Sequence, residues 1–73
     1  MTYYERIRAL REDSDKSQQN IADLLGIGQR TYCDYESGKT RIPVDRLLIL
    51  AKYYDVSMDY ICGATNRKSP YPK

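Results

Sequence analysis

One short stretch of this chain, residues 29–37, places several hydrogen-bonding side chains at spacings that share one face of a helix. At about 100° per residue these side chains fall within an arc of roughly 140°, with Thr31, Tyr32 and Tyr35 on the opposite side. The polar residues on this arc are Gln29, Arg30, Cys33, Asp34 and Ser37. A glutamine amide can pair with adenine, a guanidinium with guanine, and a carboxylate can accept from the cytosine amine. Because any soluble helix has a polar face, a solvated surface is the alternative interpretation.

A preceding helix and a tight turn are the elements that would position this face. Over residues 17–25 apolar residues recur at helical spacing, and Ser17 is a suitable N-cap. These apolar residues are Ile21, Ala22, Leu24 and Leu25. Gly26-Ile27-Gly28 then interrupts the pattern, and Gly26 can adopt the left-handed conformation that ends a helix. The pattern predicts a helix-turn-helix whose second helix, about residues 29–37, is the candidate to enter a DNA major groove.

Three further helices are predicted from hydrophobic periodicity. Residues 2–13 show one apolar stripe, which predicts that Arg6, Arg8 and Glu12 point toward water. Residues 44–54 show a broad apolar face, typical of a central core helix. That face comprises Val44, Leu47, Leu48, Leu50, Ala51 and Tyr54. A short helix follows Ser57 and stops at Gly63.

These elements predict an all-α, five-helix bundle as a single domain, residues 1–63, followed by a flexible C-terminal tail, residues 64–73. The formal net charge of +2 is only a weak indication of a polyanionic partner. There is no histidine, and Cys33 and Cys62 lie far apart, so neither a catalytic pair nor a metal site is indicated. We therefore expect no enzyme activity, no catalytic residues, no cofactor and no metal. Without a membrane span or a signal peptide at Met1, we expect a cytoplasmic protein.

Several short motifs in order along residues 4–63 resemble the helix-turn-helix domain of the Cro and phage-repressor (XRE-type) DNA-binding family. The matching motifs are Ser17-Gln18, Ile21-Ala22, Leu25-Gly26-Ile27, Tyr35-Glu36-Ser37-Gly38-Lys39, Leu50-Ala51, Val56 to Ile61, and Gly63. The resemblance implies a bundle of the lambda-repressor-like DNA-binding type. Two positions depart from it: Gly28 stands where Ser or Thr often begins the reading helix, and Lys16 stands where an apolar residue is common.

The resemblance assigns contacts to particular residues. Base contacts are expected from Gln29, Arg30 and Asp34, and also from Cys33. Gln18, at a helix N-terminus whose free N–H groups attract anions, resembles a residue that grips a DNA phosphate. The other residues predicted to contact phosphates are Ser37, Lys39, Thr40 and Arg41. Each of these side chains can alternatively be a solvated surface group.

Arg11 and Glu36 are expected to form a structural pair that holds the angle of the reading helix. In the family, the corresponding arginine of the first helix reaches the glutamate at the end of the third. Such a partly buried pair has a small net stability, but breaking it strands a charge.

The sequence therefore predicts a sequence-specific double-stranded DNA-binding transcriptional regulator, which the resemblance implies is a homodimer on a near-palindromic operator. Met58, Tyr60 and Ile61 are candidates for the dimer contact, with capping of the core as their alternative role. The competing hypothesis is a protein-interaction module, such as an antitoxin-like or bridging protein. An exposed apolar patch on the last two helices would favour that module, and phosphate-binding geometry at Gln18 and Lys39 would favour DNA.

Overall fold

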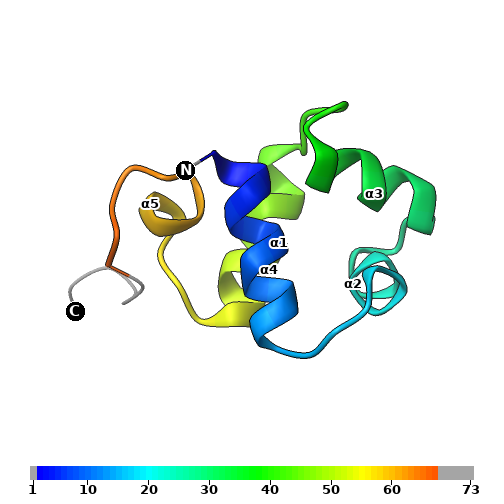
Figure 1. The fold of residues 1–73 in the computed structure, drawn as a ribbon, viewed down its shortest axis with the longest axis horizontal. Coiled ribbons are helices and arrows are strands. Elements are labelled where there is room, and N and C mark those ends of the chain that lie inside the picture. The colour runs from blue at the N-terminus through cyan, green and yellow to red at the C-terminus, as the bar shows by residue number, and fades with distance from the viewer. Residues whose placement is uncertain (1, 68–73) are drawn as a thin grey trace.

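A computed structural model describes residues 2–67, which form five helices and no strand. The helices are α1 (Tyr3–Asp13), α2 (Gln18–Leu25), α3 (Gln29–Ser37), α4 (Val44–Tyr54) and α5 (Met58–Ile61) (Figure 1). The prediction of an all-α bundle with the helix-turn-helix at its second and third helices is confirmed. Within the described residues, every helix is too short or too polar to cross a bilayer.

Local capping explains where three of the helices begin. The side chains of Thr2 and Ser17 each accept a hydrogen bond from the third backbone N–H of the helix. The side chains of Glu5 and Asn20 in turn accept from the backbone N–H groups of Thr2 and Ser17. Ser57 caps α5 in the same way, accepting from the backbone N–H of Tyr60. These contacts span three residues, which is why the sequence alone locates them.

Residues in the left-handed conformation end α2, α3 and α4. Gly26, after α2, has φ +70°, Gly38, after α3, has φ +80°, and Asp55, after α4, has φ +56°. At Gly38 there is a second constraint, because a Cβ atom would lie 2.8 Å from Cζ of the Tyr4 ring. Glycine at this position therefore serves both the turn and the close packing of α1 against the end of α3.

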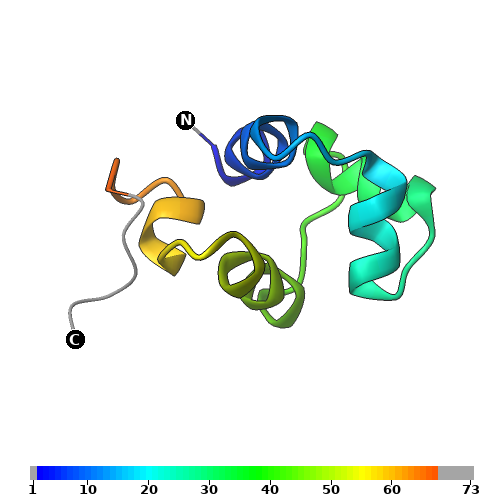
Figure 2. The same ribbon diagram turned by 90° about the horizontal axis from the view of Figure 1, so that it is seen from below.

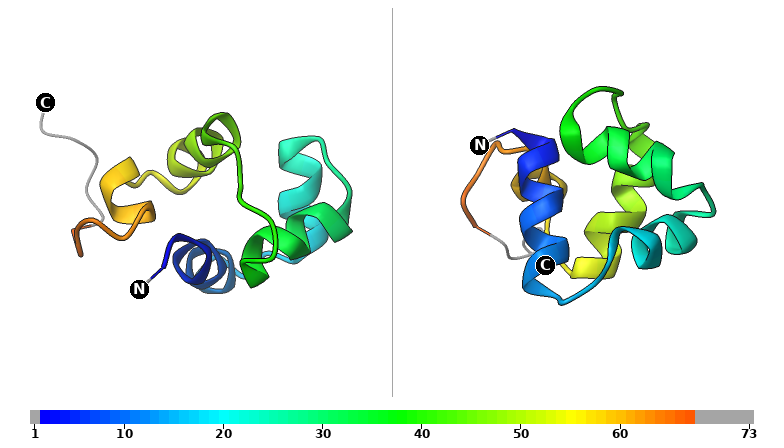
Figure 3. Two further views of the ribbon diagram at one scale, coloured as in Figure 1. Left: turned by 90° about the horizontal axis from the view of Figure 1, so that it is seen from above. Right: turned by 45° about the vertical axis from the view of Figure 1, so that its right-hand side comes forward.

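The hydrophobic core lies between α1 and α4 and extends to the inner faces of α2, α3 and α5. Figures 2 and 3 show α2 and α3 packed together at one end of the molecule and α5 at the other. The buried residues of the hydrophobic core are Ile7, Leu10, Ile21, Ala22, Tyr32, Tyr35, Ile42, Leu47, Leu50, Ala51, Val56 and Ile61. Two of the twelve are tyrosines of α3, so α3 is anchored to the core by its aromatic side.

The structure corrects two orientations that helical periodicity predicted. Arg6 is buried instead of facing water: its guanidinium lies 4.0 Å from the centroid of the Tyr60 ring, and Nη2 donates to Asn66 Oδ1 at 3.5 Å. On α4, Val44 and Leu48 were expected in the apolar core face, yet they are exposed. In both cases the neighbours that decide burial come from distant parts of the chain.

The residues that follow α5 contact the bundle as far as they are described. Ala64 N–H donates to the Asp59 carbonyl at 2.8 Å, and Asn66 accepts the bond from Arg6. The remainder of the predicted tail, residues 68–73, lies outside the described residues, so its predicted flexibility and the domain boundary at residue 63 stay predictions.

Candidate nucleic-acid interface

Helix α3 presents one polar face to solvent and buries the other. Gln29, Arg30 and Ser37 are exposed and Cys33 and Asp34 are half-buried at the edge of this face. Behind them Tyr32 is completely buried and Tyr35 nearly so. The five residues that share the predicted polar arc therefore do lie on the outer side of one short helix. Thr31, predicted on the opposite side with the two tyrosines, is exposed as well. The contacts of the five arc residues with bases stay a prediction.

Arg30 and Asp34 form an ion pair one turn apart along α3, with Nε 3.5 Å from Oδ1. The Arg30 side chain is 81% exposed, whereas that of Asp34 is only 23% exposed. A pair this open to solvent contributes little to stability. Its effect is to give Asp34 a cationic neighbour on a face where an isolated carboxylate would repel phosphates, and to leave the Arg30 guanidinium at the surface.

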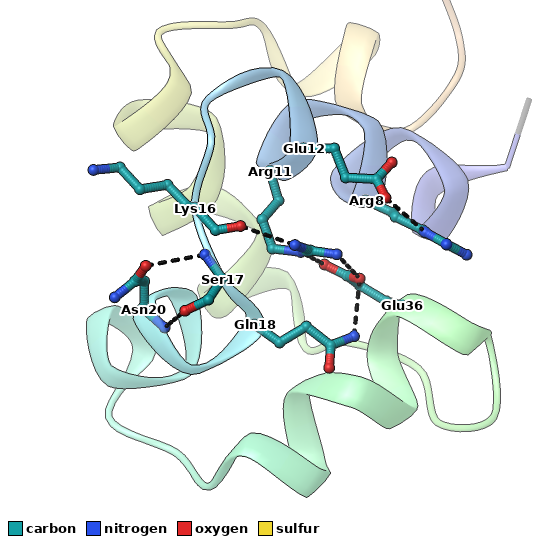
Figure 4. Close-up of polar contacts among 8 residues, drawn as sticks. All are labelled: Arg8, Arg11, Glu12, Lys16, Ser17, Gln18, Asn20 and Glu36. Carbon is teal, nitrogen blue, oxygen red and sulfur yellow. Dashed lines mark hydrogen bonds and ion pairs between the residues drawn. The ribbon is translucent and has the colours of Figure 1, made fainter.

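The orientation of α3 is held from behind by a hydrogen-bonded network centred on Glu36 (Figure 4). Arg11 of α1 binds the carboxylate with two prongs, Nε to Oε2 at 2.7 Å and Nη2 to Oε1 at 3.1 Å. The third guanidinium nitrogen, Nη1, donates to the Lys16 carbonyl at 2.8 Å. Gln18 Nε2 donates to Glu36 Oε1 at 3.2 Å. The Glu36 carboxylate thus joins α1 and α2 to the end of α3, and Arg11 extends the network to the α1–α2 loop.

Electrostatics keep this network charged. Burial by itself raises the pKa of Glu36, but hydrogen bonds from Arg11 and Gln18, with the positive charge of Arg11, outweigh it and leave the pKa below the ordinary 4.5. The bond to Glu36 in turn raises the pKa of Arg11. Burial, reinforced by the negative charge of Glu36, strongly raises the pKa of Tyr32, so its phenol is neutral at physiological pH. The side chains of Arg11 and Glu36 are only 13% and 3% exposed.

Gln18 is the first residue of α2, where backbone N–H groups lack partners within the helix, and its side chain is already bonded to Glu36. Beside it lies an open hollow of about 210 Å³ between α1, α2 and α3. Its lining residues are Arg8, Arg11, Gln18, Cys33, Glu36 and Ser37. The hollow is lined by two arginines, of which Arg11 is paired with Glu36 inside it and Arg8 with Glu12 at its edge. The phosphate contact of Gln18 stays a prediction.

Arg8 is a residue of this surface that periodicity did not single out. Its side chain is 62% exposed and pairs with Glu12 at 3.4 Å, as expected for a surface residue of α1. Only the fold shows that it also lines the hollow beside Gln18. No local signal in the sequence identifies Arg8 as part of this surface, because the other residues of the hollow include Gln18 on α2 and several residues of α3.

The loop after α3 carries three exposed polar residues, Lys39, Thr40 and Arg41. Its start is tied to α3, because the Thr40 N–H donates to the Asp34 carbonyl at 3.2 Å. Ser37 Oγ also donates to that carbonyl at 3.2 Å and accepts from the Lys39 N–H at 3.4 Å.

The end of the same loop is tied to α1. Ile42 is buried in the core, and its N–H donates to the Tyr3 hydroxyl at 3.4 Å. A second bond from Arg46 Nη1 to the Tyr35 hydroxyl, 2.6 Å long, joins the start of α4 to α3. The cationic loop is therefore held at both ends while its side chains remain in solvent. That is a suitable arrangement for binding phosphates, which stays a prediction for these residues.

The three candidates for a dimer contact on α5 occupy different environments. Ile61 is completely buried, so it caps the core and is not available to a partner. Met58 and Tyr60 are half-buried against the core, and the Tyr60 ring also carries the Arg6 guanidinium. Met58 and Tyr60 therefore remain candidates, whereas Ile61 fits the alternative role.

Comparison with known proteins agrees with this arrangement. A helix-turn-helix family model matches residues 7–61. The chain is 40% identical over 68 residues to YobD, an uncharacterized HTH-type transcriptional regulator of Bacillus subtilis (strain 168), covering 93% of this chain and 61% of YobD. It is 38% identical over 69 residues to AnsR, an HTH-type transcriptional regulator of the same organism, covering 94% and 60% of the two chains.

A phage repressor is also similar. The cryptic phage CTXphi transcriptional repressor RstR of Vibrio cholerae is 33% identical over 63 residues, which cover 86% of this chain and 56% of RstR. The chain thus spans about three fifths of the length of the curated relatives it matches.

Among solved structures, the crystal structure of a transcriptional regulator from Listeria innocua superposes with a TM-score of 0.83 at 29% identity. The match covers 90% of this chain and 62% of that one. The predicted resemblance is confirmed: the chain belongs to the helix-turn-helix family of the Cro and phage-repressor (XRE) type.

Proposed function

We propose that this chain is the DNA-reading part of a cytoplasmic transcriptional regulator and binds double-stranded DNA in a sequence-specific manner, with α3 in the major groove. The observation that carries the proposal is the two-sided construction of α3. Its inner face is anchored by buried Tyr32 and by the Glu36 network, while Gln29 and Arg30 stand exposed on its outer face. A rigidly held helix with exposed amide and guanidinium groups is what base reading requires. The relatives named as transcriptional regulators and repressors support the same function.

In this proposal Gln29 and Arg30 read base edges, and Asp34 orients Arg30. The Asp34 carboxylate also disfavours sequences that place a hydrogen-bond acceptor of a base opposite it. Cys33 lies between Arg30 and Asp34 along α3 and contacts a base or sugar edge. No catalytic step is involved.

Phosphate contacts come from both sides of α3. On one side are Gln18, with the free N–H groups at the start of α2, and Arg8, whose 62%-exposed side chain lines the same hollow. On the other side is the loop after α3, with the exposed side chains of Lys39, Thr40 and Arg41. Ser37, the last residue of α3, lies between these two groups of contacts. Such contacts supply affinity and register, whereas α3 supplies specificity.

Selection of bound sequences from random duplex DNA, followed by a salt titration of the winner, tests the function. We expect an enriched motif that binds about 10³-fold or more tightly than bulk DNA. The absence of a motif, with affinity equal to that for bulk DNA, would refute sequence-specific reading.

Two single variants then separate reading from phosphate contact on the selected site. Arg30→Ala should weaken binding about 5- to 150-fold and relax the preference at one base-pair position. Lys39→Ala should weaken binding to all sequences alike and reduce the slope of log affinity against log salt by about one. Arg67→Ala, which removes an exposed cation beyond α5, is the matched control and should change neither.

A homodimer on two half-sites is part of the proposal, because one module of this kind covers only a few base pairs. A protein-interaction module is the second candidate, and one observation favours it: α4 exposes four large apolar side chains. Binding of the selected DNA by a chain that also recruits a different protein through α4 would support both roles.

A further inference from the structure

Helix α4 carries an outward face that the core does not use. Leu47, Leu50 and Ala51 are buried on its inner side. Six residues on the other side are exposed, within about half of the helical wheel. They are Val44 (69% exposed), Asp45, Leu48 (40%), Ile49 (43%), Lys52 and Tyr53 (44%), and we call them the α4 face. Figure 2 shows α4 along one edge of the molecule, with no other helix beyond it.

The order of residues in the α4 face is nearly symmetric about its midpoint between Leu48 and Ile49. Asp45 lies in the first turn of α4 and Lys52 lies in the last, at equal distances from that midpoint. At about 100° per residue, both fall close to the midline of the face. Among the described residues, none of the ion pairs involves Asp45 or Lys52. The face therefore has one unpaired charge of each sign, separated by two apolar side chains.

This pattern is complementary to itself in one orientation. When two copies of the α4 face pack antiparallel about a two-fold axis through the midpoint, Asp45 of each copy lies opposite Lys52 of the other. Leu48 and Ile49 each meet their own counterparts beside the axis. Val44 and Tyr53 cover the two edges of the contact. A parallel arrangement would instead place aspartate against aspartate and lysine against lysine, which is unfavourable.

We propose that the α4 face is a docking surface for a second copy of this chain, arranged antiparallel about that two-fold axis. The use of this dimer on DNA rests on the proposed function, but the contact itself does not. A contact built from one eleven-residue helix per copy is at the small end of specific interfaces. The dimer is therefore weak in isolation and gains strength when two half-sites hold both copies.

Sedimentation of the free chain over a concentration series measures the contact. The wild type should show a reversible monomer–dimer equilibrium, and Leu48→Glu should abolish it because two carboxylates would meet at the axis. Leu24→Glu is the matched control, since Leu24 of α2 is also 40% exposed and lies outside the α4 face. Circular dichroism should show equal helix content in all three proteins.

Charge reversal tests the orientation. Asp45→Lys and Lys52→Asp should each raise the dimer dissociation constant about tenfold, because each turns two attractive pairs into repulsive ones. The double reversal should restore dimerisation, although it worsens the interaction of both charges with the helix dipole of α4 and so lowers the melting temperature. A mixture of the two single variants should form mixed dimers.

Three results would overturn the proposal: a wild type that stays monomeric at high concentration, a dimer that survives Leu48→Glu, or a double reversal that weakens dimerisation further. A dimer lost in Met58→Glu but retained in Leu48→Glu would place the contact on α5. Capture of a different protein by a monomeric wild type would assign the α4 face to that partner. Binding of a monomer to a single selected half-site, measured in parallel, keeps failure of this contact distinct from failure of DNA binding.

Discussion

Replacing Glu36 with alanine is predicted to weaken DNA binding through loss of stability, although Glu36 lies on the recognition helix. The Glu36 side chain is only 3% exposed, and its carboxylate accepts three hydrogen bonds, two from Arg11 and one from Gln18. Glu36→Ala removes all three hydrogen bonds. Arg11, whose side chain is only 13% exposed, is left without its counter-charge.

The expected loss can be estimated from these contacts. Removing one partner of a buried ion pair costs about 3–5 kcal/mol, because the remaining charge stays desolvated. We expect about 3 kcal/mol here, since Arg11 keeps its bond to the Lys16 carbonyl and some solvent contact. For a domain of this size that loss corresponds to a melting temperature lower by about 12–24 °C. Because domains of this length are stable by only about 4–11 kcal/mol, the loss removes about a quarter to three quarters of the free energy of unfolding.

Thermal melting by circular dichroism and DNA binding at low temperature together test this reasoning. Glu12→Ala is the matched control, because its ion pair with Arg8 is exposed on both sides and should change stability by less than about 1 kcal/mol. Glu36→Ala should bind DNA nearly normally at a temperature where it is still folded. An unchanged melting temperature together with lost binding would refute the structural role and make Glu36 a direct contact.

The remaining predictions concern the turns and the pH dependence. Gly38→Ala should lower the free energy of unfolding by about 2 kcal/mol or more, because alanine is strained at φ +80° and its Cβ would meet the Tyr4 ring. Gly26→Ala should lower it by only about 1 kcal/mol, since nothing lies within 4 Å of the added Cβ. Urea denaturation measures both losses. Gly28→Ser should stabilise the chain by about 0.5–1 kcal/mol, because Gly28 has an ordinary negative φ and provides no side-chain cap to α3, and an unchanged or lower urea midpoint would contradict this. Since the pKa of Glu36 is lowered below 4.5 in the folded state, its stabilising contribution is complete above pH 4.5 and is lost as the pH falls through the lowered value. Melting temperatures should therefore fall more steeply with acid in the wild type than in Glu36→Gln.

Much of the fold could be predicted from the sequence because its signals are local. Thr2, Ser17 and Ser57 start helices through bonds that reach three residues along the chain, and Gly26 and Gly38 end them through their own backbone angles. The polar arc of α3 was likewise predictable, since it depends only on the helical period. The match of motifs to the helix-turn-helix family then related these local elements to a known bundle.

Side-chain environments that depend on distant neighbours were not predictable in this way. Arg6 has the spacing of a solvent-facing residue, but the ring of Tyr60 from the other end of the chain covers it. Gln18 was predicted from its motif to contact a phosphate, yet only the packed bundle shows that its side-chain amide donates a hydrogen bond to Glu36. Arg8 joined the candidate interface for the same reason, through a hollow shared by three helices.

Helix α4 shows where that division lies. By itself the sequence determined that residues 44–54 form an apolar helix, because composition and period suffice for that. Only the tertiary structure decided which of its apolar residues are covered: Leu47 and Leu50 face the core, whereas Val44 and Leu48 do not. A helix can present only part of its circumference to a small core, and the packing of the other helices determines which part. The uncovered part became the α4 face.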